Sequence, residues 1–229
     1  MTPGSPASWS TPALALLIQG GSALGWSLPV ILVVSVHTTR AEWSWSYGMW
    51  PLVVTAGWLW IGVYRFTAAL SLNAGVRAHG TLARCLAAGV WGLSPFLYWH
   101  ARVPHHPWFE VMIVAAGLAG VALLYELNRL LPAVTHSLAS ESRSWETLQL
   151  CTWNRVWLGT GIILFLLLEI GQPLGRMAPL LDRWLIRCEQ FLAPMWILFL
   201  VVPMALTVTL LWSTKRCAWQ ELLRRATVR

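Results

Sequence analysis

Charged residues are scarce in this chain: Asp, Glu, Lys and Arg make up 11% of its 229 residues, whereas 57% are hydrophobic. A soluble domain carries roughly 25% charged residues, so this composition has too little charge to cover a water-facing surface. The mean hydropathy of +0.59 agrees with that exclusion. The composition therefore predicts a polytopic membrane protein.

Lysine is almost absent, with a single Lys beside 15 Arg, and the formal net charge is +7. A nucleic-acid-binding protein needs a continuous basic face. Here the basic residues lie between apolar runs and at the C-terminus, where they suit contacts with anionic lipid headgroups. We therefore expect no nucleic-acid partner. The preference for Arg over Lys is typical of a GC-rich genome.

Chemical motifs are also missing. The four cysteines are far apart and form no C-x-x-C pair, which argues against a disulfide framework or a thiolate zinc site. The chain has no G-x-S-x-G, no Walker A loop and no G-x-G-x-x-G, so a serine hydrolase or nucleotide-binding enzyme is not supported. The longest polar segment, 132–155, is too short for a folded domain. A role without catalysis is favoured.

Long apolar runs are what the sequence does contain. A bilayer core requires about 20 apolar helical residues, and continuous rather than alternating apolar character favours helices over barrel strands. Six runs approach this length: 13–36, 49–70, 82–100, 108–131, 156–171 and 191–212. We expect an all-α bundle of about six transmembrane helices in one membrane domain, residues 1–229, with a basic cytoplasmic tail at 213–229. No Lys or Arg precedes the first run, so we expect it to be retained rather than removed as a signal.

Basic residues predict the orientation of this bundle. With the C-terminus inside, ten of the 16 Lys and Arg residues fall in inner segments and five in outer loops. We therefore expect both termini on the cytoplasmic side of a bacterial inner membrane. In the last outer loop, apolar residues recur at helical spacing from 177 to 188. This pattern predicts a short interfacial helix before the last span.

Three charged residues of the predicted spans are candidates for an intramembrane role, because charge within the hydrocarbon is costly and each needs an explanation: Arg65, Glu126 and Glu169. Arg65 and Glu126 fall at a similar depth near the inner surface, so they either pair or reach the inner headgroups separately. Glu169 follows a long apolar stretch with no cation within one helical turn. It is a candidate for proton relay, ion coordination or ligand contact, or it pairs with a neighbour or a partner subunit.

Several candidate metal ligands gather on the predicted outer side, most of them in the stretch WHARVPHHPWFE. They are His37, His100, His105, His106 and Glu110. Imidazole and carboxylate groups bind zinc, copper or iron, and His37 with His100 is the pair that suits a haem. However, the spacing is not the i, i+4 of a metal pair on one helix, and Trp99 and Trp108 flank the turn as interfacial anchors do. Interfacial hydrogen bonding is therefore favoured over a metal or haem site.

Three functions are compatible with these features. The leading hypothesis is an accessory or scaffold subunit of a larger membrane complex, because polar residues are scarce in the spans and no soluble domain is present. It requires no cofactor, and its partners are the lipid bilayer and other membrane polypeptides or further copies of the chain. The second hypothesis is a transporter or channel for an ion, proton or small solute that uses Glu169. The third is a membrane-embedded metal or haem protein that uses the outer histidines.

Overall fold

Every apolar run of the sequence is occupied by a helix. The computed structural model describes residues 9–39, 47–70, 74–104, 106–138, 141–175 and 179–227, with side chains throughout except at 74–75, 141–144, 165 and 167–197. These ranges contain six helices: α1 (Thr11–Thr39), α2 (Trp50–Ala68), α3 (Ala74–Arg102), α4 (Pro107–Leu138), α5 (Glu141–Gly175) and α6 (Pro179–Thr227). The predicted all-α class is confirmed for the described residues.

Three stretches are long and apolar enough to cross a bilayer within the part of the chain that the structure describes. They are α1, α4 and residues Leu198–Thr227 of α6, which are 29, 32 and 30 residues long. α2 and α3 have 19 and 29 residues and are long enough to cross a bilayer, but Gly, Trp and Arg make them less apolar. The structure therefore supports a membrane protein with three candidate spans, fewer than the six that the sequence predicts.

Three helices begin well before their apolar runs and include neighbouring polar segments. α3 begins at Ala74 and α5 at Glu141, and α6 extends over 49 residues. The predicted interfacial helix is not a separate element, because from residue 179 onward it forms the beginning of α6. The composition explains this continuity. Residues 179–227 contain no glycine, and prolines such as Pro194 and Pro203 are tolerated inside membrane helices.

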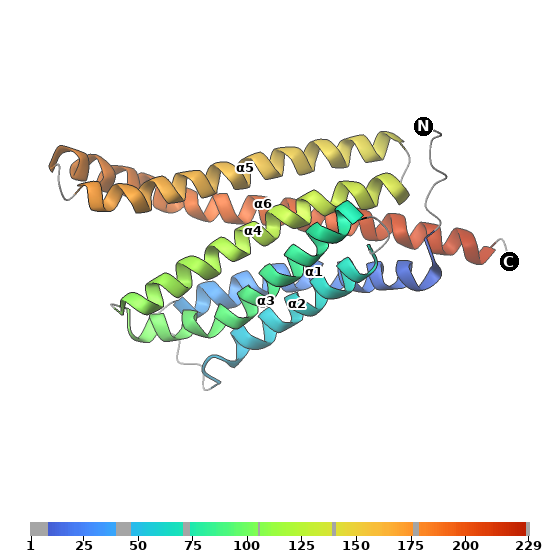
Figure 1. Ribbon diagram of the computed structural model, residues 1–229, viewed down its shortest axis with the longest axis horizontal. Helices are drawn as coiled ribbons and strands as arrows, with labels where there is room; N and C mark the ends of the chain where they lie inside the picture. Colours follow the sequence, from blue (N-terminus) through green and yellow to red (C-terminus); the bar gives the residue numbers. More distant parts are fainter. Residues whose placement is uncertain are drawn as a thin grey trace.

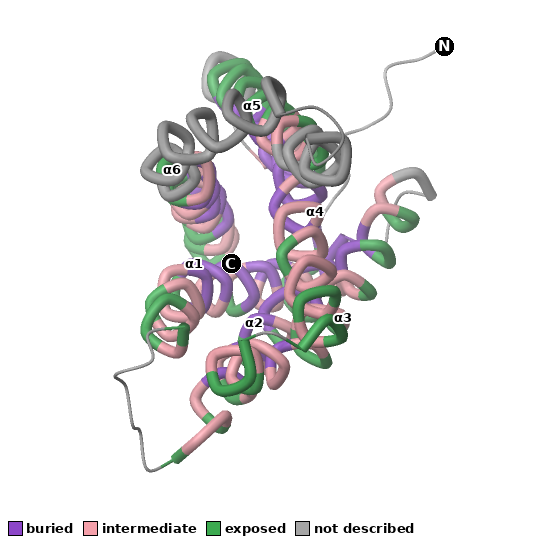
Figure 2. The backbone as a smooth tube through the Cα atoms, turned by 90° about the vertical axis from the view of Figure 1, so that its left-hand side faces the viewer, coloured by how far each residue is buried: buried purple, intermediate pink, exposed green. Residues whose placement is uncertain are grey.

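The helices form a closed ring in sequence order. Consecutive helices contact one another from α1 to α6, α6 returns to contact α1, and α4 also contacts α6. Figure 1 shows α4, α5 and α6 along one side of the molecule and α1, α2 and α3 along the other. In the view along the long axis, the buried residues lie mostly on the sides of the helices that face the interior of the ring (Figure 2).

α1 and α2 make the most extensive interface of the ring. A Cβ atom on Gly20 would lie 2.4 Å from the backbone nitrogen of Phe66, and one on Gly62 would lie 3.1 Å from that of Leu24. Small residues allow helix backbones to approach this closely in membrane proteins. The side chains of Leu24 and Phe66 are consequently fully buried.

α4 and α6 run parallel to one another in a fixed register. Asn128 bonds Thr207, and Thr135 lies 3.3 Å from Thr214, so both pairs are separated by 79 residues in sequence. The two pairs are two helical turns apart on each helix. Because α5 connects these helices, α4, α5 and α6 form one three-helix unit.

Candidate functional site

Buried polar side chains gather where α4, α5 and α6 meet. Asn128 of α4, Asn154 of α5 and Thr207 of α6 are 0%, 1% and 0% exposed. Polar groups in apolar surroundings require hydrogen-bond partners, and these residues find them in one another. We name these three side chains, together with the backbone carbonyl of Pro203, the polar cluster.

The hydroxyl of Thr207 is the centre of the polar cluster. It accepts a hydrogen bond from Nδ2 of Asn128 at 2.8 Å and one from Nδ2 of Asn154 at 3.0 Å. It donates its own proton to the Pro203 carbonyl at 2.7 Å. Asn154 Nδ2 also lies 2.9 Å from Oδ1 of Asn128 and 3.1 Å from the Pro203 carbonyl. The polar cluster thus links three helices through a few shared atoms.

The chemistry of the polar cluster suits helix association rather than catalysis. Amide and hydroxyl groups do not change charge near neutral pH. A nucleophilic hydroxyl would need an adjacent general base, and the Thr207 hydroxyl instead donates to a backbone carbonyl. One acceptor, Oδ1 of Asn154, is buried and receives no hydrogen bond from the described residues.

Glu126, one of the intramembrane charged candidates, contacts His79 on α3. One carboxylate oxygen lies 2.9 Å from Nδ1 of His79, and the side chains of Glu126 and His79 are 8% and 29% exposed. Arg65 is exposed on α2 and makes no ion pair within the described part of the chain. The alternative of an ion pair between Arg65 and Glu126 therefore does not form, because α2 and α4 are not in contact and α3 packs against both.

Glu169, the third intramembrane candidate, lies within the last two turns of α5. Its side chain is outside the described residues. The roles expected for it, from proton relay to a contact with a partner subunit, stay predictions.

The outer histidines form no metal centre among the described residues. No group of three or more His, Cys, Asp or Glu side chains is placed to hold a metal there. Three of the candidates are exposed: His37, His106 and Glu110. The ring of His106 packs beside Phe109 with 4.9 Å between centroids, and Nδ1 of His100 is buried and has no hydrogen-bond partner among the described residues. His105 lies outside the described residues, so the metal or haem alternative stays a prediction.

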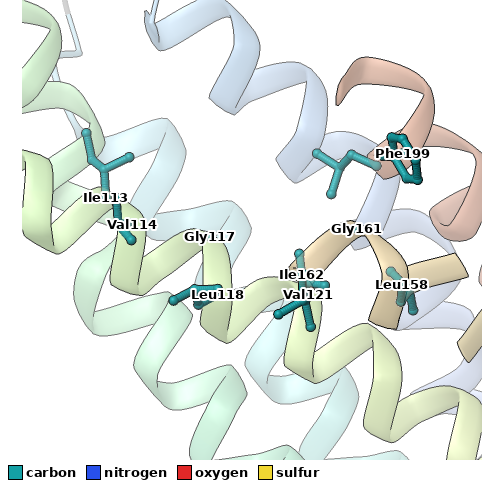
Figure 3. A pocket seen from close by; sticks show the side chains of 10 residues that line it. Ile113, Val114, Gly117, Leu118, Val121, Leu158, Gly161, Ile162 and Phe199 are labelled. Carbon is teal, nitrogen blue, oxygen red and sulfur yellow. The ribbon is translucent and has the colours of Figure 1, made fainter. Parts of the chain in front are cut away.

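Two apolar cavities lie beside α4, on the N-terminal side of the polar cluster. One, of about 380 Å³, is formed between α4, α5 and α6. Figure 3 shows the side chains of this cavity, among them Ile113, Leu158 and Phe199. The other, of about 310 Å³, is lined by residues of α1, α2, α3, α4 and α6, of which only Ser35 and Ser94 have polar side chains. Neither cavity offers a polar path among the described residues.

The glycines of α4 leave this helix unusually open. A Cβ atom added to Gly117 or Gly120 would meet no other atom within 4 Å. Gly117 lines both cavities. Space beside a glycine in a membrane helix allows close approach of another helix.

The polar cluster was not predicted from the sequence, although a signal for it exists. Asn128 and Asn154 each precede an arginine, in the stretches LLYELNRLL and LCTWNRVWL. A neutral amide within or beside an apolar run requires a hydrogen-bond partner as a charged residue does. Thr207, the shared partner of the two asparagines, cannot be identified from the sequence without knowing the register of α4 and α6.

Comparisons with known proteins assign this chain to no family. No protein-family model matches it, and no curated protein or solved structure is significantly similar to it. Its function is therefore inferred from its own geometry.

Proposed function

We propose that this protein is a multi-pass accessory or scaffold subunit of a larger membrane complex. The observation that carries the proposal is the exposure of α4. Although α4 contacts α3, α5 and α6, only 11% of its most apolar stretch is buried, compared with 50% for α1 and 33% for the apolar stretch of α6. An uncovered apolar helix with glycines and apolar cavities on its sides fits a transmembrane helix of another polypeptide.

In this proposal all six helices cross the bilayer and both termini lie on the cytoplasmic side of a bacterial inner membrane. The closed ring of consecutive contacts supports six spans, because each helix then runs antiparallel to the next. Even the shortest helix, α2, has 19 residues, or about 29 Å, which matches a hydrocarbon core of about 30 Å. The excess of Arg in the inner segments supports the orientation.

A transporter or channel is only the second candidate, because the polar side chains that could line a path are bonded to one another instead. The polar cluster, the contact between His79 and Glu126, and the 2.6 Å hydrogen bond from Arg84 to Thr67 are internal to the bundle. An ion path requires polar groups that line a continuous cavity. The two cavities beside α4 are apolar instead, and the more polar cavity, of about 690 Å³, lies where the end of α6 meets the beginning of α1. A metal or haem protein is the third candidate.

Purification from native membranes in mild detergent tests the proposal. The wild-type chain should co-purify with other polypeptides, and Gly117→Leu should release them by filling the space beside α4. Gly92→Leu is the matched control, because a Cβ atom there also meets nothing within 4 Å but belongs to α3. Isolation of the wild-type chain as a stable, partner-free protein would contradict the accessory role.

A further inference from the structure

The beginning of α1 and the end of α6 lie side by side. Figure 1 shows the blue start of α1 and the red end of α6 at the same end of the molecule. A Cβ atom on Gly25 would lie 3.0 Å from the indole nitrogen of Trp212, and one on Gly21 would lie 3.9 Å from Cβ of Lys215. α1 and α6 are therefore antiparallel neighbours. The same register, continued by two turns, brings Leu14 level with Leu222.

A cavity of about 690 Å³ lies between these two helix ends. α1 contributes Thr11 and Leu14 to its lining, and α6 contributes the apolar side chains of Leu222 and Ala226. The remaining lining residues are charged and come from the last two turns of α6. We name this space the terminal cavity. It combines apolar and charged walls, unlike the two cavities beside α4.

Two arginines and one glutamate carry the charge of the terminal cavity, which leaves a net charge of +1. Nε of Arg225 donates to one carboxylate oxygen of Glu221 at 2.8 Å, and Nη2 of Arg224 lies 3.1 Å from the other. Arg225 also donates to the backbone carbonyl of Trp9, next to the start of α1. Glu221 and Trp9 therefore hold the guanidinium groups at the cavity.

Both guanidinium groups keep donors for a ligand. Each has five N–H groups, and the described residues accept two hydrogen bonds from Arg225. The side chains of Arg224 and Arg225 are 76% and 36% exposed. No acid besides Glu221 occurs in residues 190–229, and none occurs in residues 1–41. Guanidinium groups in a positive surrounding suit a phosphate, which accepts several hydrogen bonds at once.

The terminal cavity lies at the depth of lipid headgroups. α1 has 29 residues and is about 44 Å long, which matches a bilayer of about 40–45 Å with its headgroups included. The first turn of α1 therefore lies among the headgroups at one face of the membrane. Trp219 is 52% exposed and lies about 8 Å before Arg224 on α6. An exposed tryptophan there fits the aromatic belt at the edge of the hydrocarbon.

The two kinds of wall match the two parts of a phospholipid. The arginines suit its phosphate, and the apolar side chains suit the beginning of its acyl chains. Basic pockets between membrane helices are typical sites for anionic headgroups. A bilayer also supplies lipid at this depth without any further component. A headgroup is therefore favoured over an acidic segment of another polypeptide.

We propose that the terminal cavity binds the headgroup of an anionic phospholipid. Arg224 and Arg225 donate hydrogen bonds to the phosphate, and the glycerol and upper acyl chains lie against the apolar wall. Glu221 positions the arginines and also repels the phosphate, so it limits the affinity. This inference goes beyond the accessory function, because it requires the membrane but no polypeptide partner.

Native mass spectrometry of the full-length protein in mild detergent tests the proposal. With phosphatidylglycerol and phosphatidylcholine of the same chain length present in equal amounts, the wild type should retain phosphatidylglycerol at least about fivefold more strongly. The double variant R224Q/R225Q should lose this preference. Equal retention of the two lipids by the wild type would overturn the proposal.

A second pair of arginines provides the matched control. Arg65 and Arg129 are exposed on α2 and α4, away from the terminal cavity. The variant R65Q/R129Q changes the net charge of the protein by the same amount as R224Q/R225Q and should keep the lipid preference. An equal loss in both double variants would show a general attraction to positive charge and overturn the proposal.

Glu221→Gln should have the opposite effect to loss of the arginines. It raises the net charge of the terminal cavity from +1 to +2, while the amide oxygen of Gln still accepts a hydrogen bond from Arg225. Retention of phosphatidylglycerol should increase by about fivefold. A purely structural role of these three residues predicts weaker retention, and unchanged or weaker retention would overturn the proposal. This result does not depend on the folding of R224Q/R225Q.

The same spectra distinguish the other occupants. Inorganic phosphate should not displace the lipid, and displacement would assign the terminal cavity to a free anion. A polypeptide retained by the wild type in place of lipid, and lost in R224Q/R225Q, would assign the cavity to a partner protein. Either outcome would overturn the proposal. A polypeptide retained together with lipid, and kept in R224Q/R225Q, would support both this inference and the accessory function.

Discussion

Among the described residues, Thr207 joins three helices through one atom. Its hydroxyl is shared by an amide from α4 and an amide from α5, and it donates to a carbonyl of its own helix. Hydrogen bonds between membrane helices average about 0.6 kcal/mol and reach about 1.7 kcal/mol. A hydroxyl that makes three hydrogen bonds should be one of the positions in the bundle where substitution lowers stability most.

Thr207→Val tests this sensitivity, because it keeps the shape of the side chain and removes the hydroxyl. Two buried amide donors then lose an acceptor, and we expect the free energy of unfolding to fall by about 1–3 kcal/mol. Unfolding in bicelles measures the loss. Thr209→Val is the control, since that hydroxyl is exposed and bonds only the Ala205 carbonyl of its own helix. Similar losses in the two variants would contradict the role of the polar cluster.

His79→Ala makes a second prediction at this scale. It leaves the carboxylate of Glu126, 8% exposed, without its imidazole partner, so the free energy of unfolding should fall. Arg65→Ala should change it by less than about 0.5 kcal/mol, because Arg65 is exposed. A double-mutant cycle of His79→Ala with Glu126→Gln should show coupling between the two sites. If Arg65→Ala lowered the free energy of unfolding as much as His79→Ala, an ion pair between Arg65 and Glu126 would be favoured over the contact seen in the structure.

Among the helices, two kinds of contact hold the bundle together. α1 and α2 pack backbone against backbone through glycine, whereas α4, α5 and α6 are joined by polar side chains. The α1–α2 interface depends on the absence of a side chain, whereas the contacts among α4, α5 and α6 depend on side chains being present. Enlarging a residue should therefore weaken the first interface, and truncating a residue should weaken the second.

Gly20→Ala should separate α1 from α2, because its Cβ atom would overlap the backbone of Phe66. Overpacking of this kind costs about 1–3 kcal/mol in the free energy of unfolding. Gly89→Ala is the control on α3, where a Cβ atom meets nothing within 4 Å, and it should be neutral or slightly stabilising. An unchanged free energy of unfolding in Gly20→Ala would show that α1 and α2 are farther apart than in the structure.

The C-terminal end of α6, residues 216–227, should loosen at low pH. The hydrogen bond from Arg225, assisted by Arg224, lowers the pKa of Glu221 below its ordinary value of 4.5. A carboxyl with a lowered folded-state pKa stabilises the fold above its unfolded pKa, and this stabilisation is lost as pH falls through the folded pKa. The mobility of a spin label at Trp219→Cys should therefore stay constant from neutral pH to about 4.5 and rise below it. Glu221→Gln should remove the pH dependence, and an unchanged transition in that variant would assign it to another group.

For the whole molecule, the sequence predicted which segments are helical but not where α3, α5 and α6 begin. Apolar runs are recognisable because they match the length of a bilayer, whereas residues 141–155 and 179–190 are helical without being continuously apolar. The contacts between helices could be predicted from the sequence even less well. Glu126 and Arg65 have matching depths in the sequence, but α3 packs against both of their helices, and Asn128 finds Thr207 only because α4 and α6 are parallel neighbours.

The six-span topology predicts that both termini lie on one side of the membrane. Reporter fusions at either end should be active in the cytoplasm. Single cysteines at the exposed positions Tyr47 and Val103 should react with an impermeant maleimide from outside, and one at Arg224 should react only after the membrane is opened. Termini on opposite sides would require an odd number of spans.

The register of α4 and α6 also has a consequence for biosynthesis. Asn128 is translated 79 residues before Thr207, and a ribosome that adds about 5–20 residues per second needs about 4–16 s to cover that interval. Asn154 follows Asn128 by only 26 residues and is available earlier as a partner. In the proposed six-span topology, synthesis places the α4–α5 hairpin in the bilayer first, and the Thr207 hydroxyl completes the polar cluster when α6 leaves the translocon.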